Sequence, residues 1–221
     1  MIRALLMDAD GVLQRPRKGW LREFAQLGNG VGFVKDLVVE EPQTMTGKVD
    51  LGEVLERLIR RRGLAITPQQ VIEVWCRIDP DAQMLALVRR VRAAGVLTAL
   101  ATNQQSYRGR WMQEQLPYAD YFDRSFYSFE VGLAKPDPAY FEHIVSQLGI
   151  SAGEAVFVDD MNSNVRAARA AGLKAARFGP LTPRWLLRFK LRRLGVPGVL
   201  RPSDGCWLRQ AQPPLPRQQV P

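Results

Sequence analysis

The chain has 221 residues, of which 46% are hydrophobic, enough for one domain or for a core domain with a modest insertion. Its formal net charge is +9, but eight basic residues and one acid fall within the last 41 residues, so the nearly neutral remainder is not expected to bind nucleic acid. No apolar run approaches the ~20 residues of a membrane-spanning helix, no signal-peptide pattern opens the chain, and the two cysteines are far apart, so we expect a cytoplasmic protein.

The first predicted element is a buried strand that ends in two acidic residues. Residues 2–7 are mostly apolar, and Asp8, Asp10 and Gly11 follow. Parallel strands deliver functional side chains at their carboxyl ends. Two carboxylates this close repel each other unless a cation lies between them or one is protonated. This layout suggests a carboxylate nucleophile, a general acid/base and a hard metal ion. The alternative is a pair of acids that caps the following turn.

Helical patterns dominate the next segment, residues 14–81. Residues 20–27 and 51–62 are predicted to be helical, and Thr67 with Pro68 forms the start signal of a further helix. We find no alternating strand pattern here. The segment is therefore interpreted as a helical insertion directly after the first strand.

Strands and helices alternate after this insertion. A helix is predicted over 84–95, a strand over 97–101 that leads into Thr102 and Asn103, and a helix over 137–148. Lys135 precedes that last helix. A strand over 155–158 ends at Asp159 and Asp160, and a helix over 162–171 and a strand over 174–178 follow. Such alternation predicts a parallel sheet with helices on both faces, an α/β fold.

The end of the chain is basic. Residues 181–200 contain a basic amphipathic helix, and from Arg201 to the end Pro, Gln and Arg dominate, so we expect residues 201–221 to be disordered. The helix pattern also fits contact with an anionic membrane surface or a nucleic acid, but docking on the core is the preferred interpretation.

The four polar groups occur in the order acid pair, hydroxyl, lysine and acid pair. In this order and in these strand contexts they resemble the haloacid dehalogenase (HAD) superfamily of aspartate-nucleophile hydrolases, over about residues 1–178. The resemblance implies a Rossmann-like catalytic core formed by residues 1–13 and 82–180. It also implies that residues 14–81 are a small α-helical cap.

The resemblance assigns a role to each polar residue of the motifs. It implies that Asp8 is the nucleophile and forms an aspartyl-phosphate, and that Asp10 is the general acid and then the general base. Thr102 and the backbone amide of Asn103 would bind the phosphoryl group, although both residues are also good helix N-caps. Lys135 would neutralise negative charge. Gly11 would let backbone amides approach the phosphoryl oxygens, although it also suits a plain turn.

The implied cofactor is Mg²⁺. Its ligands by resemblance are the Asp8 carboxylate, the Asp10 carbonyl and either Asp159 or Asp160, and the sequence does not say which of these two binds directly. The implied partner is a small phosphorylated substrate, and no oligomeric state is inferred.

Several other functions remain as alternatives. The first is a phosphomutase that returns the phosphoryl group to a sugar. A dehalogenase ranks lower, because Asp10 supplies a proton that a departing halide does not need. A non-catalytic binding relative is also less favoured, because folding does not need all four polar groups together. His143, the only histidine, lies inside a predicted helix away from the motifs and is interpreted as structural.

Overall fold

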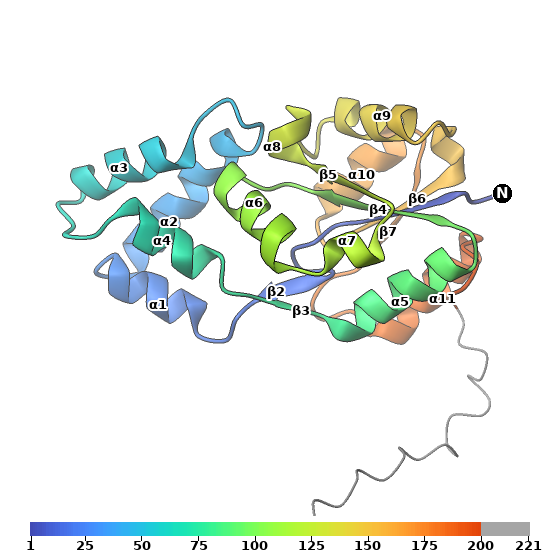
Figure 1. The fold of residues 1–221 in the computed structure, drawn as a ribbon, viewed down its shortest axis with the longest axis horizontal. Coiled ribbons are helices and arrows are strands. Elements are labelled where there is room, and N and C mark those ends of the chain that lie inside the picture. The colour runs from blue at the N-terminus through green and yellow to red at the C-terminus, as the bar shows by residue number, and fades with distance from the viewer. Residues whose placement is uncertain (200–221) are drawn as a thin grey trace, which may run out of the picture.

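A five-stranded parallel sheet in the order β5-β4-β1-β6-β7 forms the centre of the protein (Figure 1). The computed structural model describes residues 1–199. All four residues of β1 are buried, as expected for the middle strand of a sheet that is covered on both faces. The α/β fold with a parallel sheet predicted from the sequence is therefore confirmed. The strands are β1 (Ala4–Met7), β4 (Leu97–Thr102), β5 (Arg124–Tyr127), β6 (Ala155–Asp159) and β7 (Lys174–Arg177).

The register of the sheet brings three motif segments to one edge. Met7 of β1 lies opposite Leu100 of β4 and Val158 of β6. The residues that follow, Asp8 and Asp159, are therefore neighbours at the carboxyl edge of the sheet, and the amide of Asp8 donates to Val158 O at 2.9 Å. Backbone pairing thus places Asp8 and Asp159 side by side.

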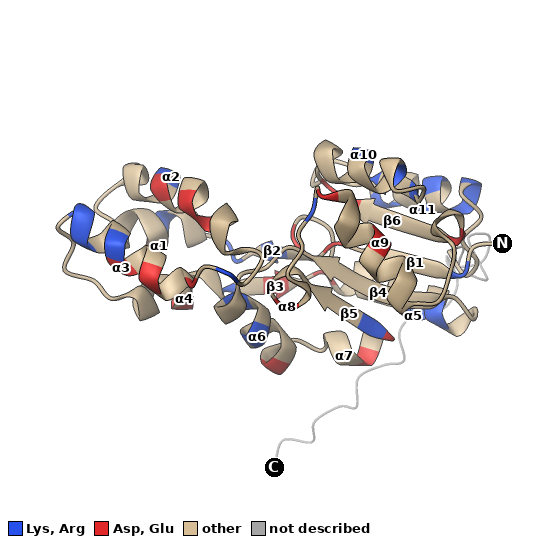
Figure 2. Ribbon diagram, turned by 90° about the horizontal axis from the view of Figure 1, so that it is seen from above, with Lys and Arg blue, Asp and Glu red and all other residues tan. Residues whose placement is uncertain are grey.

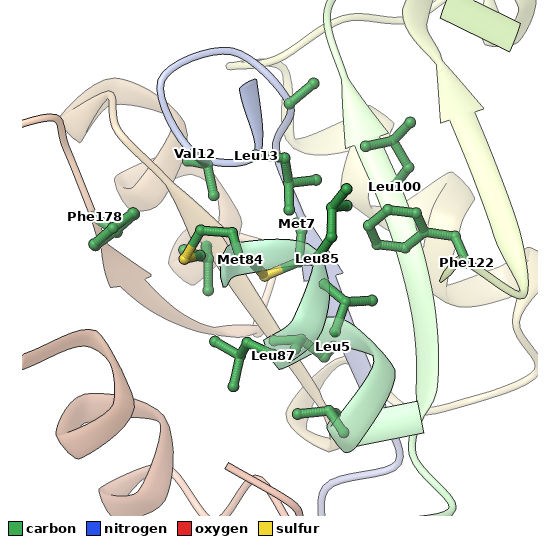
Figure 3. Packing of buried hydrophobic residues seen from close by; sticks show 14 of the residues in the cluster. Leu5, Met7, Val12, Leu13, Met84, Leu85, Leu87, Leu100, Phe122 and Phe178 are labelled. Atoms are coloured by element: carbon green, nitrogen blue, oxygen red, sulfur yellow. The ribbon is translucent and has the colours of Figure 1, made fainter. Parts of the chain in front are cut away.

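Helices cover the sheet on both faces. One face packs against α5, α6, α7 and α11 through a large apolar cluster that includes Leu5, Met7, Met84 and Leu100 (Figure 3). The opposite face packs against α9 and α10. The bounds of the core helices are α5 (Ala82–Ala93), α6 (Ser106–Gln115), α7 (Tyr118–Tyr121), α8 (Ser128–Val131), α9 (Pro138–Gln147), η2 (Ala152–Glu154), α10 (Asn162–Ala170) and α11 (Arg184–Arg193).

The segment between residues 16 and 78 forms a helical lobe beside the core (Figure 2). It has an apolar cluster of its own, centred on Phe24, Phe33 and Leu55. Helices α1, α3 and α4 lie where the sequence predicts helices, whereas α2 was not predicted because glycines surround its first turn. The elements of this helical insertion are α1 (Trp20–Leu27), α2 (Val31–Glu40), η1 (Glu41–Thr44), α3 (Leu51–Arg61) and α4 (Pro68–Trp75).

A two-stranded antiparallel ribbon joins the helical insertion to the core. It consists of β2 (Gln14–Pro16) and β3 (Ile78–Pro80), and the expectation that residues 14–81 contain no strand is wrong at both ends. Three-residue strands are too short to show an alternating pattern, and their pairing joins residues more than 60 positions apart. The ribbon matters for the site because it begins four residues after Asp10.

The basic helix α11 docks on the core. Leu187 and Leu191 are fully buried, whereas Trp185 and Phe189 are at least half exposed. The helix is shorter than the expected 181–200, and residues 201–221 lie outside the described part of the chain. Within residues 1–199, no helix has the length and apolar character needed to cross a bilayer.

Candidate active site

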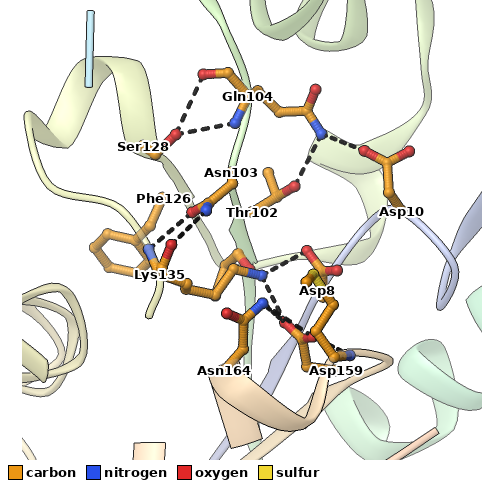
Figure 4. A network of polar contacts seen from close by, with 12 residues as sticks. Asp8, Asp10, Thr102, Asn103, Gln104, Phe126, Ser128, Lys135, Asp159 and Asn164 are labelled. Carbon is orange, nitrogen blue, oxygen red and sulfur yellow. Dashed lines mark hydrogen bonds and ion pairs between the residues drawn. The ribbon is translucent and has the colours of Figure 1, made fainter. Parts of the chain in front are cut away.

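A lysine and two aspartates form a buried group at the carboxyl edge of the sheet (Figure 4). Lys135 Nζ donates to Asp8 Oδ1 at 2.7 Å and to Asp159 Oδ2 at 2.8 Å. Its third bond goes to the Ala101 carbonyl at 3.0 Å, so all three ammonium protons have acceptors. The structure therefore brings together three of the residues that the sequence singled out. We call these three residues the lysine cluster.

Asn103 fixes the loop that carries Lys135. Its side-chain nitrogen donates to Lys135 O at 2.7 Å, and its side-chain oxygen accepts from Lys135 N at 2.9 Å. This two-way bond ties the end of β4 to the segment before α9. The sequence predicted a role for the Asn103 backbone amide at a phosphoryl group, and the structure adds this bracket formed by its side chain.

Burial and charge act in opposite directions on the lysine cluster. Burial raises the pKa of Asp8 to about 7, since the attraction of Lys135 only partly offsets desolvation and the carboxylates of Asp159 and Asp10 raise it further. Burial alone would lower the pKa of Lys135, but Asp8 and Asp159 outweigh that effect and raise it. The lysine is thus charged, and Asp8 is a carboxyl whose ionisation depends on the positive charge around it.

Asp159 and Asp160 differ in their hydrogen bonding. Asp159 is fully buried and accepts from Lys135, from the Met161 amide at 2.7 Å and from Asn164 Nδ2 at 3.1 and 3.0 Å. These bonds occupy both of its oxygens. Asp160 is half-buried, and no other residue within 1–199 donates to its carboxylate.

Asp8, Asp159 and Asp160 are the metal-ligating candidates. Each places a carboxylate oxygen within 4.8 Å of an oxygen of the others, and such an all-oxygen set suits Mg²⁺. Gly11 lies against this group with φ +75°, and a Cβ there would lie 2.5 Å from Asp160 Oδ2. The predicted glycine is therefore required for close packing against the acids, in a backbone conformation that other residues rarely adopt.

Asp10 belongs to a separate group, which we call the arginine cluster. Arg108 of α6 binds its carboxylate with both terminal nitrogens, at 2.6 Å and 2.7 Å. Gln104 Nε2 donates to Oδ2 at 2.7 Å and Gln14 Nε2 donates to Oδ1 at 3.0 Å. Burial would raise the pKa of Asp10, but Arg108 and the two amides lower it to about 2. Asp10 is therefore held as a carboxylate.

Thr102 lies between the two clusters. It is fully buried at the end of β4, and Gln104 Nε2 donates to its Oγ1 at 3.0 Å while also binding Asp10. In Figure 4, Thr102 stands beside Gln104 on the side of the lysine cluster. The predicted hydroxyl is thus linked to Asp10 through the side chain of Gln104.

A cavity of about 270 Å³ opens beside Asp10, between the helical insertion and the core. Among its walls are Glu41 and the side chains of Trp20 and Trp75. Burial raises the pKa of Glu41 to about 7, although Arg108 opposes this. A larger cavity of about 450 Å³ lies between α4 and α6, and none of the predicted site residues lines it. The lining of the smaller cavity consists of Asp10, Pro16, Trp20, Glu41, Met45, Val74, Trp75, Arg77, Asn103 and Arg108.

Sequence reasoning missed several residues of the site. Arg108, Gln104, Gln14 and Glu41 have no motif spacing of their own, and only the packing of α6, β2 and η1 against the first loop places them near Asp10. His143, interpreted as structural, packs its ring edge-on against Phe126. It forms no part of either cluster.

Comparison with solved structures supports the fold. A HAD family enzyme from Bacteroides thetaiotaomicron, solved in complex with magnesium and inorganic phosphate, superposes with a TM-score of 0.72 at 22% identity, covering 85% of this chain and 99% of the other. At this identity the likeness speaks for the fold alone.

Comparison of the sequence with known proteins identifies the family. A phosphoglycolate phosphatase of Yersinia pseudotuberculosis is 32% identical over 185 residues, 77% of this chain and 78% of the relative. A sesquiterpene phosphatase of Aspergillus oryzae is 38% identical over 96 residues, 43% of this chain. This match spans only 49% of the relative, and a match to the bifunctional epoxide hydrolase 2 of Sus scrofa spans 35% of it. The family model for haloacid dehalogenase-like hydrolases matches residues 2–172, and the chain therefore belongs to this family of hydrolytic enzymes.

Proposed function

We propose that this hydrolase is a magnesium-dependent phosphatase that acts on a small phosphorylated metabolite through an aspartyl-phosphate on Asp8. The observation that supports this most directly is the buried contact between Asp8 and Lys135, with a second acid, Asp10, two residues away. Phosphatase names among the relatives support it as well. A cytoplasmic location stays a prediction from the sequence.

The first step is the attack of Asp8 on phosphorus. Oδ1 is bonded to Lys135, so Oδ2 is the oxygen available to attack. A bond forms between Oδ2 and phosphorus while the bond from phosphorus to the alcohol oxygen breaks, and Asp10 gives its proton to the departing oxygen. Lys135 and the Thr102 hydroxyl offset the charge that develops on the phosphoryl oxygens.

The second step is hydrolysis of the aspartyl-phosphate. Water attacks phosphorus and loses a proton to Asp10, and the bond to Asp8 breaks to release inorganic phosphate. The ionised Asp10 seen here, with its pKa near 2, is in the form that accepts this proton. Protonation of Asp10 for the first step requires its bonds to Arg108 to loosen when substrate fills the cavity.

Magnesium fits the acids at the sheet edge. We propose that Asp8, the Asp10 carbonyl and Asp160 hold it, because Asp159 already accepts four hydrogen bonds whereas the Asp160 carboxylate receives none from other residues within 1–199. When bound, the ion supplies positive charge that offsets the repulsion between the carboxylates and a phosphoryl group.

The test is steady-state hydrolysis of p-nitrophenyl phosphate with Mg²⁺ and with EDTA. We expect metal-dependent turnover in the wild type and a loss on the order of 10³-fold or more in Asp8→Asn, since no nucleophile remains. Asp120→Asn is the matched control, because this exposed acid of α7 lies outside both clusters, and it should keep full activity.

Two outcomes would contradict this proposal. Turnover that survives both Asp8→Asn and EDTA would exclude the aspartyl-phosphate mechanism. Isomerisation of a sugar phosphate without release of inorganic phosphate would identify a phosphomutase instead.

A further inference from the structure

The cavity beside Asp10 lies where the leaving group of a phosphate ester must go. Its floor is the core, through Asp10, Asn103 and Arg108, and its roof is the helical insertion. Asp8 and Asp10 flank the path of the phosphoryl group, so the alcohol that departs faces the roof. Residues of the roof therefore contact the part of the substrate that differs between phosphate esters.

One charged residue of this cavity has no partner. Asp10 and Arg108 bind each other, and Arg77 forms an ion pair with Glu23. Glu41, in the first turn of η1, forms no ion pair, and its side chain accepts no hydrogen bond, within residues 1–199. Three of the four charged groups in the lining are thus neutralised, and the Glu41 carboxyl is the one left to interact with a ligand.

Arg108 is not available to bind an anionic ligand. Two of its nitrogens bind Asp10, one of these also donates to Gln104 Oε1 at 2.7 Å, and Nε donates to the Trp75 carbonyl at 3.1 Å. A carboxylate entering the cavity would meet Glu41 and find this guanidinium occupied. The electrostatics of the cavity therefore disfavour a second negative charge on the leaving group.

Aromatic walls hold the cavity in shape. Trp20 and Trp75 both pack edge-on against the buried Phe24, with ring centroids 5.3 Å and 5.5 Å apart. Such packing fixes the indole planes. A cavity of about 270 Å³ is small for a ligand site and suits a leaving group of a few heavy atoms whose polar end lies near Glu41.

On the basis of the proposed phosphatase function, we infer that Glu41 selects the substrate by binding a hydrogen-bond donor on the leaving alcohol. Esters that carry a hydroxyl or an ammonium group a few bonds from the phosphate are favoured, and esters that carry a carboxylate there are rejected. Desolvation raises the pKa of Glu41 more than the nearby Arg108 lowers it, which agrees with a carboxyl that forms no ion pair or side-chain hydrogen bond within residues 1–199.

The experiment compares kcat/KM for four esters of similar length at pH 8, where Glu41 is ionised. They are propyl, 3-hydroxypropyl, 3-aminopropyl and 2-carboxyethyl phosphate. In the wild type we expect the hydroxyl or ammonium ester, or both, to exceed propyl phosphate on the order of tenfold, and the carboxylate ester to fall below it. If kcat/KM is highest for the ammonium ester, the substrate class is amino alcohol phosphates. If it is highest for the hydroxyl ester, the substrate class is polyol phosphates.

Variants of Glu41 separate selection from folding. In Glu41→Gln the ratio of ammonium to propyl ester should fall on the order of tenfold, and the penalty on the carboxylate ester should shrink. Glu41→Asp keeps the charge and should keep the order of the four esters. Glu56→Gln, an exposed acid on α3 of the same helical insertion, should match the wild type.

The inference fails if the three kcat/KM ratios relative to propyl phosphate are the same in Glu41→Gln and in the wild type, or if the wild type prefers the carboxylate ester. A folded wild type that releases phosphate from none of the four esters, nor from p-nitrophenyl phosphate, would overturn the proposed function together with this inference. Release with unchanged ratios would overturn the inference alone.

Discussion

The two acids of the first motif stand two residues apart and yet occupy opposite electrostatic environments. Asp8 shares the ammonium of Lys135 with Asp159, and its pKa rises to about 7. Asp10 forms the one ion pair of Arg108 within residues 1–199 and accepts from two amide donors in addition, and its pKa falls to about 2. Both acids follow the same strand, so backbone position does not cause the difference.

The ratio of positive to negative charge explains this contrast. In the lysine cluster one cation faces two buried carboxylates, so desolvation prevails. In the arginine cluster one cation faces one carboxylate with two parallel hydrogen bonds, so attraction prevails. Two carboxyls with separated pKa values are what acid–base chemistry at neutral pH requires. The partners, rather than the residue type, therefore set the role of each acid.

Replacing Lys135 by Met should have the largest effect on this contrast. Asp8 and Asp159 would face each other without a cation in a buried setting. We expect a loss of about 3 kcal/mol in the free energy of unfolding, the range found when one partner of a buried ion pair is removed. Urea unfolding at pH 8 in EDTA measures it.

Two further variants make the Lys135 result specific. Lys48→Met, at an exposed loop position, should change stability by less than about 0.5 kcal/mol. Adding Asp159→Asn to Lys135→Met should recover part of the loss, because one of the two facing charges disappears. A Lys135→Met protein as stable as the wild type would show that the two carboxylates are not ionised together.

Replacing Arg108 by Gln should have a smaller effect, and a pH-dependent one. The ion pair with Arg108 lowers the pKa of Asp10 from 3.8 to about 2. The stabilisation of the folded state by this pair is therefore fully present above about pH 4 and disappears as the pH falls through 2. The Asp10 side chain is 38% exposed, so screening limits the loss at pH 7 to about 1–2 kcal/mol.

Urea midpoints between pH 7 and pH 2.5 test this. The difference in urea midpoint between the wild type and Arg108→Gln should become smaller as the pH approaches 2.5. Arg110→Gln, on the exposed side of α6, should have the same midpoint as the wild type at every pH. A gap that stays constant with pH would mean that Arg108 acts through packing and through its bond to Trp75, and not through the charge of Asp10.

The lysine cluster was much easier to predict from the sequence than the arginine cluster. Asp8 and Asp159 follow apolar strands, and the register of a parallel sheet brings such positions together whatever the loops do. Lys135 stands in a recognisable Lys-Pro-Asp-Pro string.

Arg108 and Glu41 have no such signal. Arg108 lies in a helix whose orientation depends on packing, and Glu41 reaches the site only through the fold of an insertion with its own core. The two short strands of the β2–β3 ribbon were missed for a related reason, since long-range pairing and not local pattern creates them. The register of neighbouring parallel strands can be predicted from a sequence, but the docking of one lobe on another cannot.

Glu41 is a partly buried carboxyl that forms no ion pair within residues 1–199, and its substitution should change the free energy of unfolding by no more than that of Arg108. Its pKa rises from 4.5 to about 7, so the folded state binds a proton more tightly than the unfolded chain does. The wild type should therefore lose stability as the pH rises from about 4.5 to 7 and lose no more of it from this group above that range. Glu41→Gln has no carboxyl to titrate at this position. Its free energy of unfolding, relative to that of the wild type, should therefore increase by about 1–2 kcal/mol between pH 5 and pH 8, as measured by urea unfolding. Parallel pH profiles for the two proteins would mean that a counter-charge or water already compensates Glu41, and the contrast between paired and unpaired carboxyls would then rest on Asp8 and Asp10 alone.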